Sequence, residues 1–226
     1  MSIFKPYRFY SKSAIEYQAS HLLRRMQGRG CQFAPSWPFD ATLVADFLDL
    51  GVVWEPISPD ELGAIAARIL PQQRLIEINE DILDLPQGFQ ESTLAHEIGH
   101  WVLHINQEVA DGVTFPTEKP EPDNLNSNDP FFCRGKGSSR ELDSIEWQAQ
   151  YFAGCLLMPR HILMEKAHQR DLTRWQHLYQ LKDELGVSIS NLVNRLQDLG
   201  WIYVPKGSRQ IYPGQAAIAE ELPLFG

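Results

Sequence analysis

The segment with the clearest chemical potential is His-Glu-Ile-Gly-His at residues 96–100, near the middle of the chain. Residues four apart lie one above the other on a helix, so His96 and His100 could bind one Zn²⁺ at roughly 2.0–2.1 Å each. Glu97 is turned by about 100° around the helix from His96, which makes it a poor third ligand. It is instead well placed to take a proton from a zinc-bound water, the role of the glutamate in H-E-x-x-H hydrolases.

The alternative interpretation is a solvated polar helix face that carries two histidines. A random chain of this composition has only about a 1–2% chance of containing the motif, which favours the hydrolase interpretation. His104 continues the ladder, but on a straight helix its Cα lies about 12 Å along the axis from that of His96. We therefore expect His104 to support a ligand from behind, or to be a packed polar residue, and not to bind the ion.

A third ligand must come from another element, because a catalytic zinc takes three protein ligands and keeps one position open. The best candidate is Glu146, on a predicted helix whose apolar face carries Ile145, Ala149 and Phe152. Gln150, one turn further on, shares the face of Glu146 and could hydrogen-bond a ligand histidine. Taken alone, Glu146 would be interpreted as an ordinary solvated glutamate. It is a candidate ligand only because the chain also contains His96 and His100.

The elements that must position these residues are indicated by periodicity. Helices are predicted over 13–26, with a capping box of Ser13 and Glu16, and over 40–50, where Gly51 ends the helix. A short strand is predicted at 52–54 and a hairpin over 64–79 around the turn at 71–73. We expect residues 74–79 to form the sheet edge beside the cleft, where an extended substrate strand could pair with it.

Residues 106–140 change character and are rich in Pro, Asn and Asp. Between Glu108 and Asp129 there are six acidic residues and one basic residue, Lys119. Such a composition cannot build a core of its own, so we predict a mobile flap or a disordered loop that shapes access to the site. An ordered functional element is the alternative.

Residues 160–212 are predicted to form three helices and a hairpin, the order of a winged helix-turn-helix unit. A DNA-binding regulator is therefore a competing hypothesis. This segment has eight Lys/Arg against five Asp/Glu, and only Arg195 is basic within the would-be recognition helix. We expect DNA binding to be absent and the tail to be a scaffold or substrate-docking unit packed on the preceding domain.

The sequence resembles a known family over roughly residues 40–200. "HEIGHWVLH" followed by "IEWQAQYFAGCLLMP" is similar to the two motifs of the ImmA/IrrE metallopeptidases, although Gln150 stands where these usually have asparagine. The resemblance implies that His96, His100 and Glu146 bind zinc and that Glu97 activates water. It also implies that the substrate is a helix-turn-helix repressor of the XRE type. A non-cleaving pseudoenzyme is a third hypothesis, but every residue that the chemistry needs is present.

Length and composition limit the possible location and fold class of the protein. The chain has 226 residues, a net charge of −9 and three cysteines, and no run of eighteen apolar residues. We see no secretory signal and therefore expect a cytoplasmic protein that does not enter a membrane. The fold class expected is α+β, with a zincin-like metallopeptidase domain and a small mixed sheet over residues 1–159. A helical winged-helix-like tail over 160–212 and an extension over 213–226 would follow.

Overall fold

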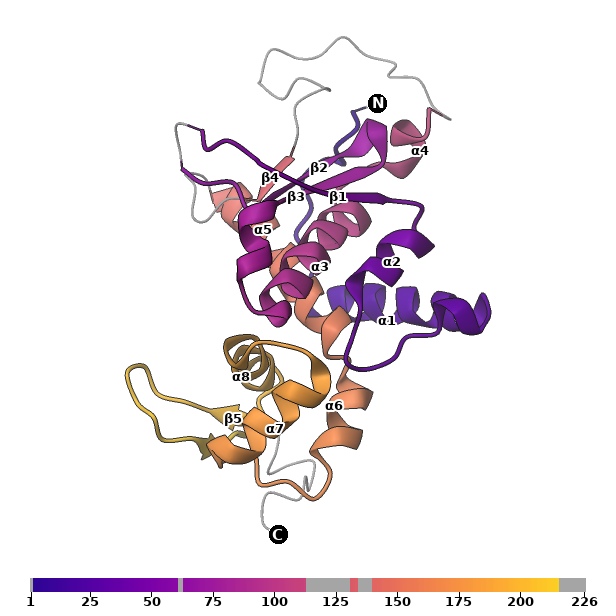
Figure 1. Cartoon of the computed structure of the whole chain (residues 1–226). Coiled ribbons are helices and arrows are strands. Elements are labelled where there is room, and N and C mark those ends of the chain that lie inside the picture. Colours follow the sequence, from indigo (N-terminus) through magenta and orange to yellow (C-terminus); the bar gives the residue numbers. More distant parts are fainter. Residues whose placement is uncertain (1, 61–62, 113–130, 134–139, 216–226) are drawn as a thin grey trace.

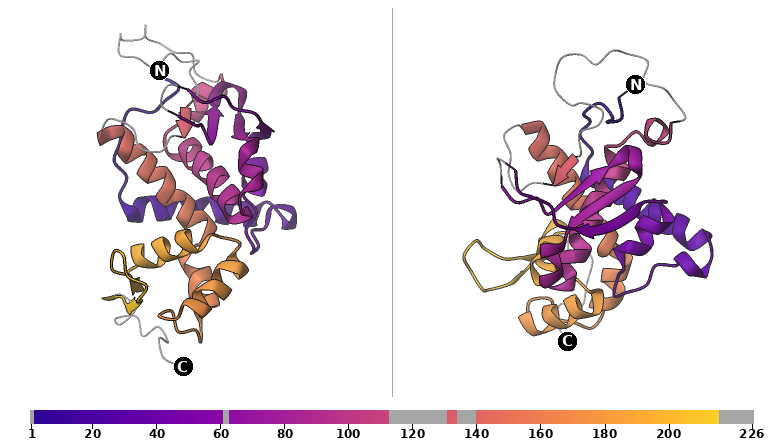
Figure 2. Two further views of the ribbon diagram at one scale, coloured as in Figure 1. Left: turned by 60° about the vertical axis from the view of Figure 1, so that its left-hand side comes forward. Right: turned by 45° about the horizontal axis from the view of Figure 1, so that its top comes forward.

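In a computed structural model, the structure describes residues 2–60, 63–112, 131–133 and 140–215, which form eight α-helices and two small sheets (Figure 1). The four-stranded sheet lies at one end, the long helices α3 and α5 lie in the middle, and the last three helices lie at the other end. The views of Figure 2 show the same order of layers. The predicted mixture of helices with a small sheet is confirmed.

The larger sheet has the strand order β1-β3-β2-β4. Its strands are β1 (Gly51–Glu55), β2 (Ala67–Leu70), β3 (Leu75–Asn79) and β4 (Phe131–Cys133). β3 pairs with β1 in parallel and with β2 antiparallel, and β4 pairs antiparallel with β2. The predicted hairpin is therefore confirmed, with a 3₁₀ turn at Pro71–Gln73 between its strands.

The prediction that residues 74–79 form the sheet edge is wrong, because β3 lies between β1 and β2. Ile76 and Ile78 are fully buried, as expected for a central strand. In the described part of the chain, the two edge strands are β1 and β4. Residues 131–133, which form β4, belong to the segment that the sequence predicted to be a loop.

Two helices, α1 and α2, precede the first strand of this sheet in the chain. α1 (Lys12–Gly28) is capped by Ser11, whose hydroxyl accepts a hydrogen bond from the Ala14 amide at 3.2 Å, so the predicted capping box at Ser13 is not used. α2 (Ala41–Phe47) is capped by Asp40 and ends before Gly51, which is the first residue of β1.

The helices α3 (Gln87–Leu103) and α5 (Arg140–Leu157) pack closely in the centre of the molecule. A Cβ added at Gly99 of α3 would lie only 3.0 Å from the carbonyl oxygen of Ala149 on α5. Glycine therefore allows the two backbones to approach. The short helix α4 (Gln107–Ala110) follows α3; residues 113–130 and 134–139, most of the predicted flap, lie outside the described residues.

The tail contains α6 (Arg160–Ala167), α7 (Trp175–Leu185), α8 (Ile189–Asp198), and the paired strands β5 (Ile202–Tyr203) and β6 (Tyr212–Pro213). Three helices and a hairpin occur in the predicted order. α8 begins at the cap Ser188, after Gly186 has ended α7 in the left-handed conformation, with a φ of 73°. Leu192 and Leu196 of α8 are fully buried and belong to the same core as α1, α3 and α5.

None of the described helices combines the length and the apolar character that are needed to cross a membrane.

Candidate metal centre

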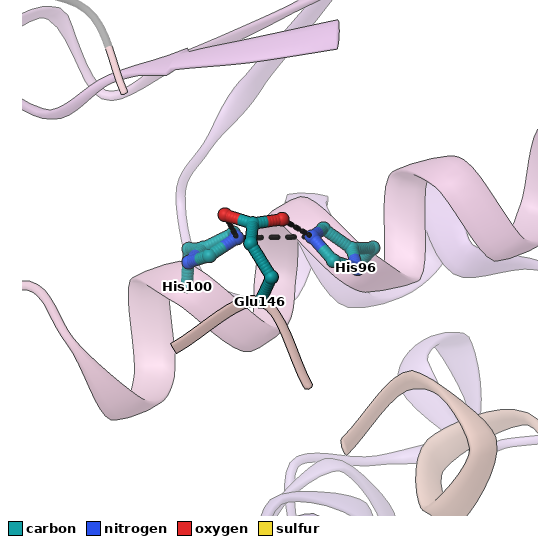
Figure 3. Close-up of side chains that lie close together, drawn as sticks. All are labelled: His96, His100 and Glu146. Atoms are coloured by element: carbon teal, nitrogen blue, oxygen red, sulfur yellow. Dashed lines mark hydrogen bonds and ion pairs between the residues drawn. The ribbon is translucent and has the colours of Figure 1, made fainter. Parts of the chain in front are cut away.

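The structure brings His96, His100 and Glu146 together at the packed surface between α3 and α5 (Figure 3). The Nε2 atoms of the two histidines are 3.0 Å apart. Glu146 Oε2 lies 3.1 Å from His96 Nε2, and Glu146 Oε1 lies 3.4 Å from His100 Nε2. One helix thus supplies the two imidazoles, and the carboxylate reaches them from a second helix fifty residues further along the chain.

These separations suit a small tetrahedral cation. Ligand atoms at about 2.1 Å from zinc in a tetrahedron are about 3.4 Å from one another. The observed separations of 3.0–3.4 Å are close to this value, so a modest outward movement would accommodate an ion. The donor set of two imidazoles and one carboxylate is also one that catalytic zinc uses. The residues present therefore fit a metal, and their assignment as ligands stays a prediction.

The protonation states of these groups favour metal binding. Burial acts to raise the pKa of Glu146, but hydrogen bonds from His100 and His96 outweigh it and bring that pKa down to about 2. Burial lowers the pKa of His100 to about 4. At neutral pH the carboxylate is therefore charged and the His100 imidazole is neutral, which are the forms that bind a metal ion.

Glu97 is completely buried on α3, next to His96. The alternative interpretation of a solvated polar helix face is wrong, because His96, Glu97 and His100 are all buried. The reason is tertiary: α3 contacts β2, β3, α2 and α5, so its polar side is covered as well as its apolar side. Glu97 therefore lies inside the protein on the helix that carries the two histidines, and its role as general base stays a prediction.

His104 lies directly behind His100. Their Nδ1 atoms are 3.1 Å apart, and His104 is only 9% exposed. Burial and the neighbouring His100 lower the pKa of His104 to about 3, so its ring is neutral. A neutral His104 can accept a hydrogen bond from the Nδ1–H of His100 and so leave His100 Nε2 free for a metal. The backbone carbonyl of His104 accepts a hydrogen bond from the Lys5 amide at 2.9 Å, which ties this position to the N-terminal segment.

One other residue singled out by the sequence lies elsewhere. Gln150, expected behind a ligand histidine, is exposed, and the buried amide of α5 is Gln148. Gln148 accepts a hydrogen bond from the Tyr10 amide and donates one to the Ser144 hydroxyl, each at 3.2 Å. Helical periodicity did not indicate Gln148, because the segment that covers it lies more than a hundred residues away in the chain.

The hydroxyl of Tyr151 on α5 contacts residues of two other helices. Its hydroxyl donates a hydrogen bond to Glu16 Oε1 at 3.0 Å and lies 3.4 Å from Arg195 Nη1. Burial raises its pKa. Tyr151 therefore joins α1, α5 and α8.

Comparison with known proteins identifies the family to which the chain belongs. The model of the IrrE N-terminal-like domain, a peptidase family, matches residues 57–197, which include α3, α5 and most of the tail. The chain belongs to this family. The resemblance seen in the sequence is thereby confirmed, and a metallopeptidase family implies a metal, for which the described residues offer the His96, His100 and Glu146 group.

Other comparisons are more distant. No curated protein matches the chain closely enough to count as a relative. A solved structure of a Mycobacterium tuberculosis transcriptional regulator is 18% identical, with a TM-score of 0.46. The similarity covers 83% of this chain and 47% of that one, so this chain spans about half the length of that protein. A likeness at this level carries no functional argument.

Proposed function

We propose that this protein is a zinc-dependent endopeptidase that cleaves a helix-turn-helix repressor of the XRE type, and that it acts in the cytoplasm, where such repressors work. The observation that carries the proposal is the cluster of His96, His100 and Glu146, whose donor atoms all lie within 4.8 Å of one another. Membership of a peptidase family supports the reaction type. The choice of substrate rests on the resemblance to the ImmA/IrrE enzymes.

The chain's own residues divide the work between binding and proton transfer. His96, His100 and Glu146 hold the ion, which when bound supplies Lewis acidity for water activation and carbonyl polarisation. Glu97 takes the proton from the attacking water and delivers it to the amine that leaves. Burial of Glu97 keeps bulk water away from this proton.

A single substitution tests the mechanism. Glu97→Gln is nearly isosteric and cannot act as a base, so it should retain the metal while cleavage falls by about 10²–10⁴-fold. The assay follows fragments of the helix-turn-helix repressor encoded nearest to this gene, and Glu165→Gln on the exposed side of α6 is the control. If Glu97→Gln cleaves at the wild-type rate, the mechanism is wrong. If the wild-type and Glu165→Gln proteins also fail to cleave, the result favours the hypothesis of a non-cleaving pseudoenzyme.

The competing hypothesis is a winged-helix regulator, and one observation argues against it. Arg195, the basic residue of α8, is 3% exposed and pairs with Glu16, with Arg195 Nη1 2.9 Å from Glu16 Oε1. Its guanidinium therefore faces the protein core and cannot reach a phosphate. We expect only weak, salt-sensitive binding in an anisotropy titration with the protein's own upstream DNA. Dissociation constants of about 10⁻⁸–10⁻¹¹ M at physiological salt would favour the regulator.

A further inference from the structure

A groove lies between α5 and α8. It has a volume of about 320 Å³. The groove is lined by Ser92 of α3, by residues on α5 and at its end, and by residues on α8: Trp147, Gln150, Tyr151, Gly154, Leu157, Met158, Asn191, Asn194, Arg195, Gln197 and Asp198. We call this the α5–α8 groove.

Two helices carry residues of both the groove and the metal centre. Gln150 follows Glu146 by one turn of α5, and Ser92 precedes His96 by one turn of α3. Residues four apart lie on the same helical face, so the lining includes the positions one turn away from two of the three candidate metal ligands. Its far wall is α8, which belongs to the tail (Figure 1).

The chemistry of the lining is that of a surface for an uncharged polypeptide. Gln150, Asn191 and Asn194 present carboxamides, each of which has a donor and an acceptor and can pair with a backbone carbonyl and a backbone amide. Trp147 also belongs to the lining, and its ring is held in place because it stacks between Tyr151 and the exposed Phe9 at centroid distances of 5.5 and 6.1 Å.

The charged residues of the groove are already compensated within the protein. Asp198 binds Lys12 at 2.6 Å, and Arg195 binds Glu16 at 2.9 Å. The lining therefore provides no free charge to hold a charged ligand. Its volume is at the lower end of the roughly 300–1,000 Å³ found for ligand sites, enough for one or two residues of an extended chain but not for a folded domain.

From this placement we infer that the α5–α8 groove is a substrate subsite, which binds an extended, uncharged polar stretch of polypeptide next to the bond that is cut. The inference rests on the proposed peptidase function and extends it, because it gives the tail a direct part in substrate selection. α8 would then contribute Asn191 and Asn194 to specificity, in place of the DNA contacts that its position in a winged helix would suggest.

Gly154 offers a way to fill the groove without disturbing the core. A Cβ added at Gly154 would have only the Arg195 side chain near it, at the ordinary contact distance of 3.9 Å. Gly154→Met therefore keeps the helix and places a flexible side chain in the groove. Gly28→Met is the matched control, because Gly28 also belongs to a helix and has no atom within 4 Å of an added Cβ.

The experiment measures binding without cleavage. Full-length, zinc-loaded Glu97→Gln protein is immobilised, and a mixture of peptides from digested bacterial protein is passed over it; retained peptides are identified by mass spectrometry. We expect uncharged polar sequences to be enriched. Adding Gly154→Met should lower their retention by about tenfold or more, equal to about 1.4 kcal/mol, whereas Gly28→Met should not.

A second variant protects the test against misfolding. Asn194→Ala removes one exposed carboxamide and should lower retention by a few fold, with zinc content and melting temperature unchanged. Equal retention by the Gly154→Met and Gly28→Met proteins, or no sequence enrichment at all, would overturn the subsite. Failure of the proposed peptidase function would give a different result. The peptides would still be retained by the groove, but protein that keeps Glu97 would not cut them.

Discussion

At the scale of single residues, the main finding is a row of three histidines, two in α3 and one at its C-cap, each of which has a different environment. His96 and His100 meet Glu146, and His104 meets the far side of the His100 ring. Hydrogen bonds of this kind fix the tautomer and the orientation of a ligand histidine, and their loss typically costs about 10–100-fold in metal affinity.

His104→Ala should therefore weaken zinc binding by about 10–100-fold while leaving the secondary structure intact. Competition against a chromogenic chelator measures the change, and His168→Ala on the exposed end of α6 serves as the control. A zinc affinity equal to that of the wild type would show that His104 is merely packed.

The stability of the metal-free protein should fall in weak acid. A histidine in the unfolded chain has a pKa of about 6.5, whereas burial lowers the pKa of His100 to about 4 and that of His104 to about 3. Below about pH 6.5 the unfolded state therefore binds more protons than the folded state, so the free energy of unfolding decreases as pH falls towards 4. Glu146, with its pKa lowered to about 2, adds a loss that begins near its ordinary value of 4.5.

Urea unfolding of metal-free protein at pH 7.5 and pH 4.5 checks this sign. We expect a lower midpoint at pH 4.5, and a smaller decrease in His104→Gln, which lacks one of the two lowered histidines. The exposed His168→Gln should retain the full decrease. An unchanged midpoint between the two pH values would contradict the expected environments of these side chains.

At the scale of elements, the site depends on how closely α3 and α5 pack. Gly99 lies on the contact side of α3, and an added Cβ would meet Ala149 Cα at 3.1 Å and Phe152 Cδ1 at 3.2 Å. Any side chain at this position must push α5 outward, and Glu146 moves with it. Gly99 therefore sets the distance between α3, which carries two of the candidate ligands, and α5, which carries the third.

Gly99→Ala should destabilise the protein by up to about 2 kcal/mol, because overpacking costs roughly 1–3 kcal/mol and the better helix propensity of alanine returns about 1 kcal/mol. Zinc affinity should fall with it. Gly28→Ala, where the space is open, should be neutral or stabilising. Thermal melts and zinc titrations of both variants decide the matter; an unaffected zinc affinity in Gly99→Ala would mean that α5 has room to adjust.

At the scale of the whole molecule, the tail is joined to the metal-binding part by a buried polar network. Arg195 of α8 donates hydrogen bonds to the Met158 carbonyl at 3.2 Å and to Glu16 of α1 at 2.9 Å. Trp37 Nε1 donates to the Leu157 carbonyl at 2.8 Å on the same side. The predicted boundary at residue 159 thus separates segments that share one core.

Arg195→Leu should lower the free energy of unfolding by roughly 3 kcal/mol, since it leaves Glu16 and the Met158 carbonyl without their partner in a largely buried place. The value is at the lower end for a buried pair because Glu16 is partly exposed. Arg174→Leu, whose side chain is 70% exposed, is the control. Denaturant melts measure both, and equal stability of the two variants would show that the network contributes nothing.

The sequence by itself determined what depends on local spacing. The interval of four between His96 and His100 requires only a helix, and the periodicity from Ile145 to Phe152 placed Glu146 on another. The strands β2 and β3 and the helices of the tail likewise follow from alternation, caps and turns, which are properties of neighbouring residues. These features were predicted because a chain segment of about ten residues contains all the information for them.

Only the tertiary structure decided which distant segments meet. It brought Glu146 to the histidines, put β3 inside the sheet, buried Glu97, and left Gln150 exposed while it buried Gln148. It also made Arg195, the basic residue of the would-be recognition helix, a buried partner of Glu16. Each of these outcomes depends on contacts with residues that are remote in sequence. The sequence of a helix alone does not specify which of its polar faces another element will cover.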